Sequence, residues 1–281
     1  CSSLVFSMFP IYVYASSQIS SAALAIFLIV FFYYFFLKIT KKSNFLYIVL
    51  FSITAGLLIL TRREFIAIVI LTSIYLFLFF KKPTKDILLI LLLSTLTISP
   101  YLARNYITFD KIIIHSGFGY NLWQGNNPNS NVEGSEIINK DLQNLIDTIP
   151  KDKFYRIKED KIFISEAIGN IKENPTRYLI LYFKKIFSYI FIDLNSTQPN
   201  YYNPFHFLPI LLIAITSTFG IFLSDKKSYR LNYLILIYLF YIALIPIFAI
   251  QPRYKLYIIP FQIIFSFIFV NFIKEKYFSK K

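Results

Sequence analysis

The fold of this chain is decided by a run of nineteen uncharged residues, ISSAALAIFLIVFFYYFFL, at positions 19–37. An α-helix rises about 1.5 Å per residue, so this run is close to the roughly 30 Å thickness of the hydrocarbon layer of a bilayer. Three lysines, Lys38, Lys41 and Lys42, follow within five residues. The stretch therefore predicts a transmembrane helix with one positively charged end.

The rest of the chain repeats this pattern. Hydrophobic residues make up 56% of the 281 residues and charged residues only 16%, with a mean hydropathy of +0.57. A water-soluble domain could not bury so much apolar surface. We predict an all-α, polytopic transmembrane protein with about five spans in residues 1–103 and about three in residues 194–281. Besides residues 19–37, the predicted spans are 4–15, 43–61, 65–80, 87–103, 207–223, 231–252 and 256–273.

The positive charge of the chain indicates its orientation. The net charge is +14, from 29 Lys+Arg against 15 Asp+Glu. Most of this excess lies in three short loops and the C-terminal tail, at 38–42, 81–86, 225–230 and 274–281, which the positive-inside rule makes cytoplasmic. Segment 104–177 has ten residues of each sign and is neutral. Because no basic face is concentrated on a folded domain, we exclude nucleic acid as a partner.

The long segment 104–193 is predicted to lie outside the membrane as a helical loop domain. It opens with turn residues, since four of the seven glycines and five asparagines fall within residues 117–134. Apolar residues at helical spacing then predict helices from Ser135 to about Thr148 and over about 152–173.

Residues 178–193 are apolar enough to suggest a ninth span, but two lysines argue against one. Lys184 and Lys185 would each cost roughly 2.5–3.5 kcal/mol at the centre of a bilayer. We therefore predict an interfacial amphipathic helix that begins at Asn174-Pro175, with Arg177, Lys184 and Ser188 on one face.

Motifs for common chemistries are absent. The sequence has no Walker loop, no glycine-rich dinucleotide turn, no nucleophile elbow and no paired histidines at metal spacing. Its one cysteine, Cys1, excludes an intrachain disulfide and a cysteine-based zinc site. We interpret His115 and His206 as structural or interfacial rather than catalytic.

The remaining candidate residues are charged side chains that the predicted topology places at the outer membrane surface. They are Arg62, Arg63 and Glu64 in one short turn, Arg104 at the end of a span, and Arg253 in the last outer turn. Each alone is explained equally well as a polar residue that a turn requires. Together, the arginines predict a cationic patch suited to a lipid-linked phosphate, because a guanidinium binds phosphate oxygens in pairs.

Five stretches give the chain a family resemblance. It resembles bacterial GT-C glycosyltransferases of family 39, which include enzymes like protein O-mannosyltransferase and aminoarabinose transferase. The similarity follows the chain in order and spacing. The stretches are GLLILTRRE at 56–64, SPYLARNY at 99–106, GYNLWQGNNP at 119–128, ENPTRY at 173–178, and Arg253-Tyr254 with Pro260.

The resemblance implies a polyprenyl-phosphate-linked sugar as donor, transfer on the extracytoplasmic side and inversion at the anomeric carbon. Such enzymes carry an acidic catalytic residue in their first outer loop, and no matching loop exists here. We therefore expect Cys1 to lie inside a longer protein, with the catalytic residue upstream and this piece alone inactive. No metal site is predicted, and a requirement for a divalent metal stays open.

The predicted substrate-binding residues have separate roles. Arg104 and Arg253 are assigned to the phosphate, with Arg62 next, and Glu64 either pairs with a neighbouring arginine or contacts an acceptor amine. The predicted wall for sugar or acceptor consists of Tyr120, Asn121, Trp123, Asn126 and Asn127. A turn that only packs against the spans would explain these five residues equally well. The remaining substrate-binding residues are Arg63, Asn105, Tyr106 and Tyr254.

These observations predict a membrane glycosyltransferase of the bacterial cytoplasmic membrane with an outward-facing active site. Its partners would be the polyprenyl-phosphate-linked sugar and membrane lipid. The alternative is a transporter or flippase of lipid-linked sugars, although transporters usually carry repeats and charged or broken spans. A structural membrane subunit is the third possibility.

Overall fold

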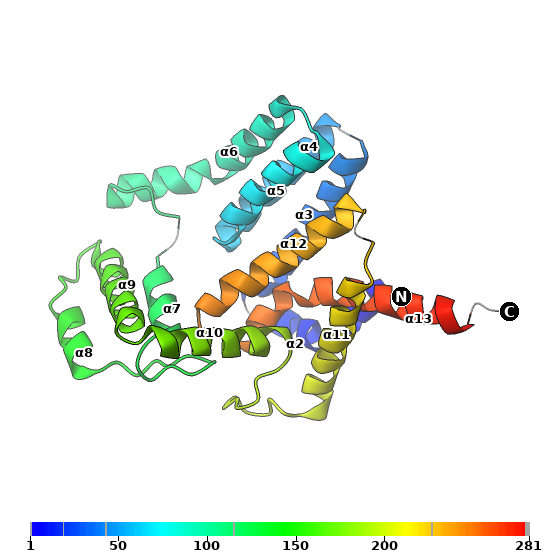
Figure 1. Cartoon of the computed structure of the whole chain (residues 1–281). Coiled ribbons are helices and arrows are strands. Elements are labelled where there is room, and N and C mark those ends of the chain that lie inside the picture. Colours follow the sequence, from blue (N-terminus) through cyan, green and yellow to red (C-terminus); the bar gives the residue numbers. More distant parts are fainter. Residues whose placement is uncertain (1, 19, 43, 115, 226, 279–281) are drawn as a thin grey trace. The chain divides into compact units, whose positions relative to one another are not determined.

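The computed structural model describes residues 2–18, 20–42, 44–114, 116–225 and 227–278, and all regular secondary structure in these ranges is helical (Figure 1). The predicted all-α class is confirmed for this part of the chain. The chain divides into two compact units. The first unit comprises residues 1–17, 116–225 and 234–281, and the second comprises residues 18–115 and 226–233.

The second unit is a bundle of apolar helices. Its core is aromatic: Tyr233 stacks on Phe36 with ring centroids 3.9 Å apart, and its hydroxyl lies 2.6 Å from the Thr72 hydroxyl. The central helix α4 packs against α3 and α6. The helices are α3 (Ser21–Lys41), α4 (Phe45–Thr61), α5 (Phe65–Phe80), α6 (Thr84–Phe109) and the first turn of α12 (Tyr229–Leu244).

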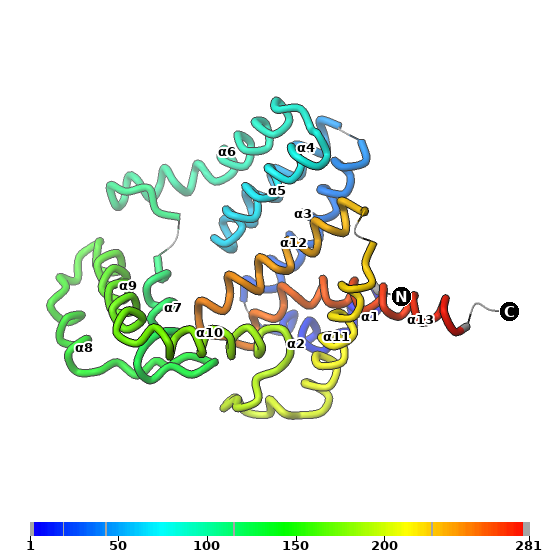
Figure 2. The backbone as a smooth tube through the Cα atoms, in the orientation of Figure 1, coloured from blue at the N-terminus to red at the C-terminus, as the bar shows by residue number. Residues whose placement is uncertain are grey.

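The first unit combines a helical loop region with further apolar helices, and Figure 2 traces its path. Within it α7 packs against α9, and α11 packs along α13. Its elements, besides the rest of α12, are α1 (Ser2–Met8), α2 (Pro10–Ser17), α7 (Phe118–Gly125), α8 (Lys140–Asp147), α9 (Tyr155–Glu173), α10 (Pro175–Ile190), α11 (Pro204–Phe222), η1 (Ile245–Ile247), η2 (Pro252–Tyr257) and α13 (Ile259–Phe278).

Among the residues that the structure describes, four helical segments are long and apolar enough to cross a membrane. They are α3, α6, α11 and the continuous stretch Tyr229–Ile247, while α4 and α5 are apolar but shorter. On α6, Leu88, Leu92 and Leu96 form an exposed stripe at steps of four residues. Such a stripe is costly in water and favourable against lipid, which fits a membrane protein.

The prediction of a single span at 4–15 is wrong. Helix α1 ends at Met8 and α2 begins at Pro10, so the apolar run is divided into two short helices. Proline has no N–H to donate and disfavours the helical conformation in the residue before it, here Phe9. The Tyr12 hydroxyl then fixes α2 by donating to the Leu256 carbonyl at 2.8 Å.

The helix that contains the predicted span 87–103 is longer than the span, because α6 begins at Thr84 and continues to Phe109. Pro100 lies inside this helix and cannot donate to the Leu96 carbonyl. The Ser99 hydroxyl donates to that carbonyl instead, at 2.8 Å. The helix ends where Asp110 adopts a left-handed conformation, with φ of 52°.

The loop region differs from its prediction in three places. The helix expected from Ser135 is only α8, which Asn139 caps by accepting from the Leu142 N–H. Helix α9 begins at Tyr155 rather than at Asp152. The glycine- and asparagine-rich stretch contains a helix, α7, that the turn composition concealed.

Other boundaries follow capping and proline chemistry. Helix α10 begins as predicted, with the Asn174 side chain accepting from the Arg177 N–H. The span predicted at 231–252 ends early, because the chain becomes 3-10 helical at Ile245 and Pro246. Helix α13 begins at Ile259, after η2.

We predict that Gly220→Ala destabilises the protein. A Cβ at Gly220, on α11, would lie 1.8 Å from the Phe265 carbonyl oxygen of α13, so the two helices would have to separate. Overpacking of this kind costs about 1–3 kcal/mol. Thermal unfolding of the purified protein in detergent should show a lower Tm.

The matched control is Gly169→Ala on α9, where an added Cβ meets nothing within 4 Å. Alanine favours a helix over glycine by up to about 1 kcal/mol, so this variant should be unchanged or more stable. Equal Tm values for the two variants would contradict close packing of α11 on α13.

Candidate functional site

The predicted substrate residues are divided between the two units. Arg62, Arg63 and Glu64 form the turn between α4 and α5 in the second unit, and all three are half-buried. The Arg62 N–H donates to the Leu58 carbonyl at 2.7 Å and ends α4. Glu64 precedes α5, and its side chain makes no capping hydrogen bond. These residues thus form a short turn between two apolar helices, as the sequence predicted.

Arg104, Asn105 and Tyr106 lie on the last two turns of α6, also in the second unit. Arg104 is exposed, and its guanidinium donates to the Asn105 Oδ1 at 3.1 Å. Asn105 is buried, and its Nδ2 donates to the Ile113 carbonyl at 2.6 Å. The amide therefore fixes the chain after α6 and orients the guanidinium, while Tyr106 is exposed.

The predicted aromatic and polar wall lies in the first unit, on and after α7. Tyr120 and Asn121 are half-buried on α7. Trp123 is 2% exposed and packs against Phe163 of α9, with ring centroids 5.0 Å apart. It is part of an apolar cluster shared by α7, α8 and α9, so its ring surface is already covered by protein.

Asn126 and Asn127 are buried, and their amides bind main chain. The Asn126 Nδ2 donates to the carbonyls of Leu122 and Ile247, each at 2.8 Å. The Asn127 Nδ2 donates to the Ser135 carbonyl at 2.7 Å. In this geometry the two asparagines hold the loop after α7 in place.

Arg253 and Tyr254 begin η2 in the first unit. The Arg253 guanidinium is exposed and lies 5.6 Å from the centroid of the Tyr254 ring. The Tyr254 carbonyl accepts from the Tyr189 hydroxyl at 3.3 Å, which joins η2 to α10.

Next to this pair is a buried lysine that sequence reasoning missed. Lys255 is 2% exposed, and its Nζ donates to the carbonyls of Ser188, Tyr189 and Phe191 at 2.7, 3.1 and 2.5 Å. These carbonyls close the C-terminal end of α10, where the helix dipole favours a cation. Burial lowers the pKa of Lys255 to about 7, although the Asp193 carboxylate raises it. In the sequence, nothing distinguishes Lys255 from an ordinary charged residue of a turn.

Lys185 is a second buried lysine, on α10 itself. It is 1% exposed, and its Nζ donates to the Gly125 carbonyl at the end of α7, at 2.6 Å. Burial, and to a lesser degree the positive charge of Arg177, lowers its pKa to about 7. Lys185 is one of the two lysines whose cost at the centre of a bilayer argued against a ninth span, and in the structure protein surrounds it.

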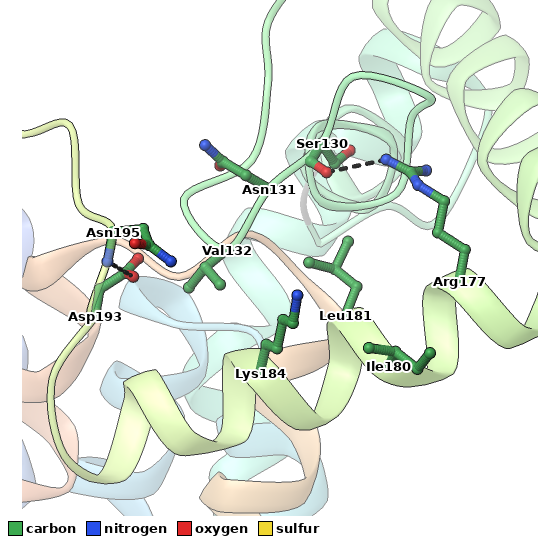
Figure 3. Close-up of a pocket in the computed structure, with 9 residues that line it drawn as sticks. All are labelled: Ser130, Asn131, Val132, Arg177, Ile180, Leu181, Lys184, Asp193 and Asn195. Atoms are coloured by element: carbon green, nitrogen blue, oxygen red, sulfur yellow. Dashed lines mark hydrogen bonds between the residues drawn. The ribbon is translucent and has the colours of Figure 1, made fainter.

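A cavity of about 480 Å³ opens between α10 and the loops beside it (Figure 3). Arg177 borders it and donates to the carbonyls of Pro128 and Ser130 at 2.8 and 3.1 Å. Two turns further along α10, Lys184 rises towards the loop that carries Asn131 and Val132. The full lining is Ser130, Asn131, Val132, Arg177, Ile180, Leu181, Lys184, Asp193 and Asn195.

The described lining of the cavity includes a lysine without a partner among the described residues, and a buried carboxylate. Lys184 is exposed and makes no hydrogen bond or ion pair with any residue that the structure describes. Asp193 is 6% exposed and accepts from the Asn195 N–H at 2.9 Å. Burial raises the pKa of Asp193.

The described residues contain no group of three or more His, Cys, Asp or Glu side chains that could hold a metal ion. His206 is half-buried beside Tyr201, with ring centroids 5.8 Å apart, and His115 lies outside the described residues. The arrangement brings Arg104 together with Asn105, and Tyr120 together with Trp123.

Comparisons with known proteins give no relative. No protein-family model, curated protein or solved structure matches the chain.

We predict that the free energy of unfolding rises with pH between about pH 7 and 9.5. A lysine whose pKa falls from 10.5 to about 7 on folding binds fewer protons in the folded state over this range, so stability increases as the pH rises. Each such lysine contributes at most about 1.4 kcal/mol per pH unit.

Replacing Lys185 with Met should reduce this slope, as measured by unfolding in detergent at several pH values. Lys184→Met is the matched control, because that neighbouring side chain is exposed and should leave the slope unchanged. A Lys185→Met slope equal to that of the parent protein would show that the burial of Lys185 is not the cause.

Proposed function

We propose that the chain belongs to a GT-C-type membrane glycosyltransferase with a GT-C-like fold. It would move a sugar from a polyprenyl-phosphate donor to an extracytoplasmic acceptor, at the outer face of the bacterial cytoplasmic membrane. The acceptor would be a lipid, glycan or protein. The observation that carries the proposal is the exposed Arg104 guanidinium at the end of an apolar helix, oriented by the buried Asn105.

The depth of Arg104 in the proposed membrane supports a lipid phosphate as its ligand. Leu88, Leu92 and Leu96 form the exposed apolar stripe of α6, and Arg104 lies eight residues beyond Leu96. At about 1.5 Å per residue, this is about 12 Å further along the helix. An arginine there would lie beyond the acyl chains, at the level of lipid phosphates.

The chemistry of sugar transfer gives such an arginine a role. As the bond from sugar to phosphate breaks, negative charge grows on the departing phosphate, and a fixed guanidinium stabilises it there. Within the second unit, Arg104 would bind this phosphate, with Arg62 next. A carboxylate would take the proton of the acceptor.

Among the predicted wall residues, Tyr120 and Asn121 suit a sugar or acceptor best. Both are half-buried on α7 and retain accessible surface. Trp123, Asn126 and Asn127 would act indirectly, because packing or main-chain carbonyls already occupy their side chains.

We predict that Arg104→Ala lowers sugar transfer on the order of 100-fold, the size expected when one fixed donor to a developing anion is lost. The assay uses membranes from cells that produce the full-length protein, a labelled polyprenyl-phosphate sugar, and chromatography of the transferred label. Arg104→Lys should recover only part of the activity, because an ammonium cannot bind two oxygens of a phosphate in the bidentate manner of a guanidinium.

The control is Lys172→Ala, which removes an exposed lysine in the last turn of α9, away from the residues that line the cavity beside Tyr120. It should keep normal transfer. If Arg104→Ala transfers sugar normally at an equal protein level, Arg104 does not bind the phosphate. Movement of the labelled lipid across the membrane without transfer of its sugar would favour the flippase alternative.

A further inference from the structure

Helix α10 has an apolar face that no described part of the chain covers. Leu179, Ile180, Phe183 and Phe187 are each between 46% and 60% exposed. Their spacing places them on one side of the helix. The opposite side is buried and includes Tyr178, Leu181, Lys185, Ser188 and Tyr189.

The two faces together suit a position of α10 in the plane of a membrane surface. Its buried side is fixed to the protein at two points, through Lys185 to the end of α7 and through Lys255 at its own C-terminus. The rest of its accessible surface carries Arg177 and Lys184, and an apolar face with basic residues beside it is typical of a helix that lies in the membrane interface. The exposed face of α10 therefore meets lipid.

The cavity lies at the boundary between these two faces. Ile180 belongs to the exposed apolar face and also lines the cavity. Lys184 follows it by one turn, and its ammonium has no partner among the described residues. A lipid beside α10 could thus keep its acyl chains against the apolar face while its headgroup enters the cavity.

Charge and size limit the headgroup. Arg177 and Lys184 are positive and Asp193 is negative, so these three side chains have a net charge of +1. This balance suits a phosphodiester, which has one negative charge, better than a phosphate monoester with nearly two. Asn131, Asn195 and the Asp193 carboxylate can bond hydroxyl groups. The volume of about 480 Å³ is in the usual range for small-molecule sites.

We propose that this cavity binds the headgroup of an anionic bilayer phospholipid whose phosphodiester carries a hydroxylated group, as in phosphatidylglycerol. The phosphodiester contacts Lys184 and is attracted by the positive charge of Arg177. The headgroup hydroxyls contact Asn131 and Asn195. The Arg177 guanidinium already donates to main-chain carbonyls, so Lys184 is the main free cation. Affinity is then modest, which suits an abundant bilayer lipid better than a scarce donor. The proposal is independent of the sugar-transfer reaction.

The test measures lipid retained by the full-length protein. The protein is purified in detergent with mixed micelles of phosphatidylglycerol and phosphatidylcholine of matched chains, and native mass spectrometry counts the bound lipids. We expect preferential retention of phosphatidylglycerol, and a loss on the order of tenfold in Lys184→Gln. The matched control is Lys161→Gln, an exposed lysine on α9 outside the cavity, which should retain the lipid normally.

A second variant tests the charge balance. Asp193→Asn removes the negative charge and keeps an oxygen that can accept from the Asn195 N–H. It should shift the preference towards phosphatidic acid, a phosphate monoester, whereas a merely structural role for Asp193 would leave the preference unchanged.

Three results would overturn the proposal. Equal phosphatidylglycerol retention by Lys184→Gln and Lys161→Gln would show that the cavity is not the site. Displacement of bound lipid by inorganic phosphate alone would remove the contribution of the apolar face. Displacement by trace polyprenyl phosphate would reassign the cavity to that lipid. No sugar donor is present, so failure here is separate from failure of the transferase assay.

Discussion

The first unit depends on two buried lysines that bind the C-terminal ends of helices. Lys185 donates to the last residue of α7, and Lys255 donates to three carbonyls that close α10. The final carbonyls of a helix lack intrahelical partners and carry its partial negative charge. Through these bonds the loop after α7, helix α10 and the turn at η2 become one support. Arg253 and the cavity beside Lys184 are both built on it.

The sequence predicts this architecture where local chemistry is decisive. The bounds of α5 follow from the charges at its ends, and the start of α10 follows from Asn174 and Pro175. The predicted span 87–103 contains Pro100, and α6 continues through it while the Ser99 hydroxyl donates to the Leu96 carbonyl. The sequence prediction fails at Pro10, where the predicted span 4–15 divides into α1 and α2.

Site residues are harder to predict than helices, because the same residue type serves binding and folding. The sequence predicts both Asn105 and Asn126 as substrate-binding residues because they lie in polar stretches. In the structure, Asn105 orients an exposed arginine, whereas Asn126 holds a loop on η1. Lys184 and Lys185 are adjacent and differ only in the direction that the helix gives them. Pattern alone places both on α10. Only packing in three dimensions makes one a buried anchor and the other a free cation.

The arginines illustrate the same distinction in terms of donor capacity. A guanidinium has five N–H donors. Arg177 uses donors on both terminal nitrogens for the carbonyls of Asn127, Pro128 and Ser130, so it supports the loop and contributes mainly charge to the cavity. Among the described residues, the Arg104 guanidinium donates to the neighbouring Asn105, and its other donors remain available to a ligand. An anion that needs directed hydrogen bonds is therefore better served by Arg104, and one that needs only a positive field by Arg177.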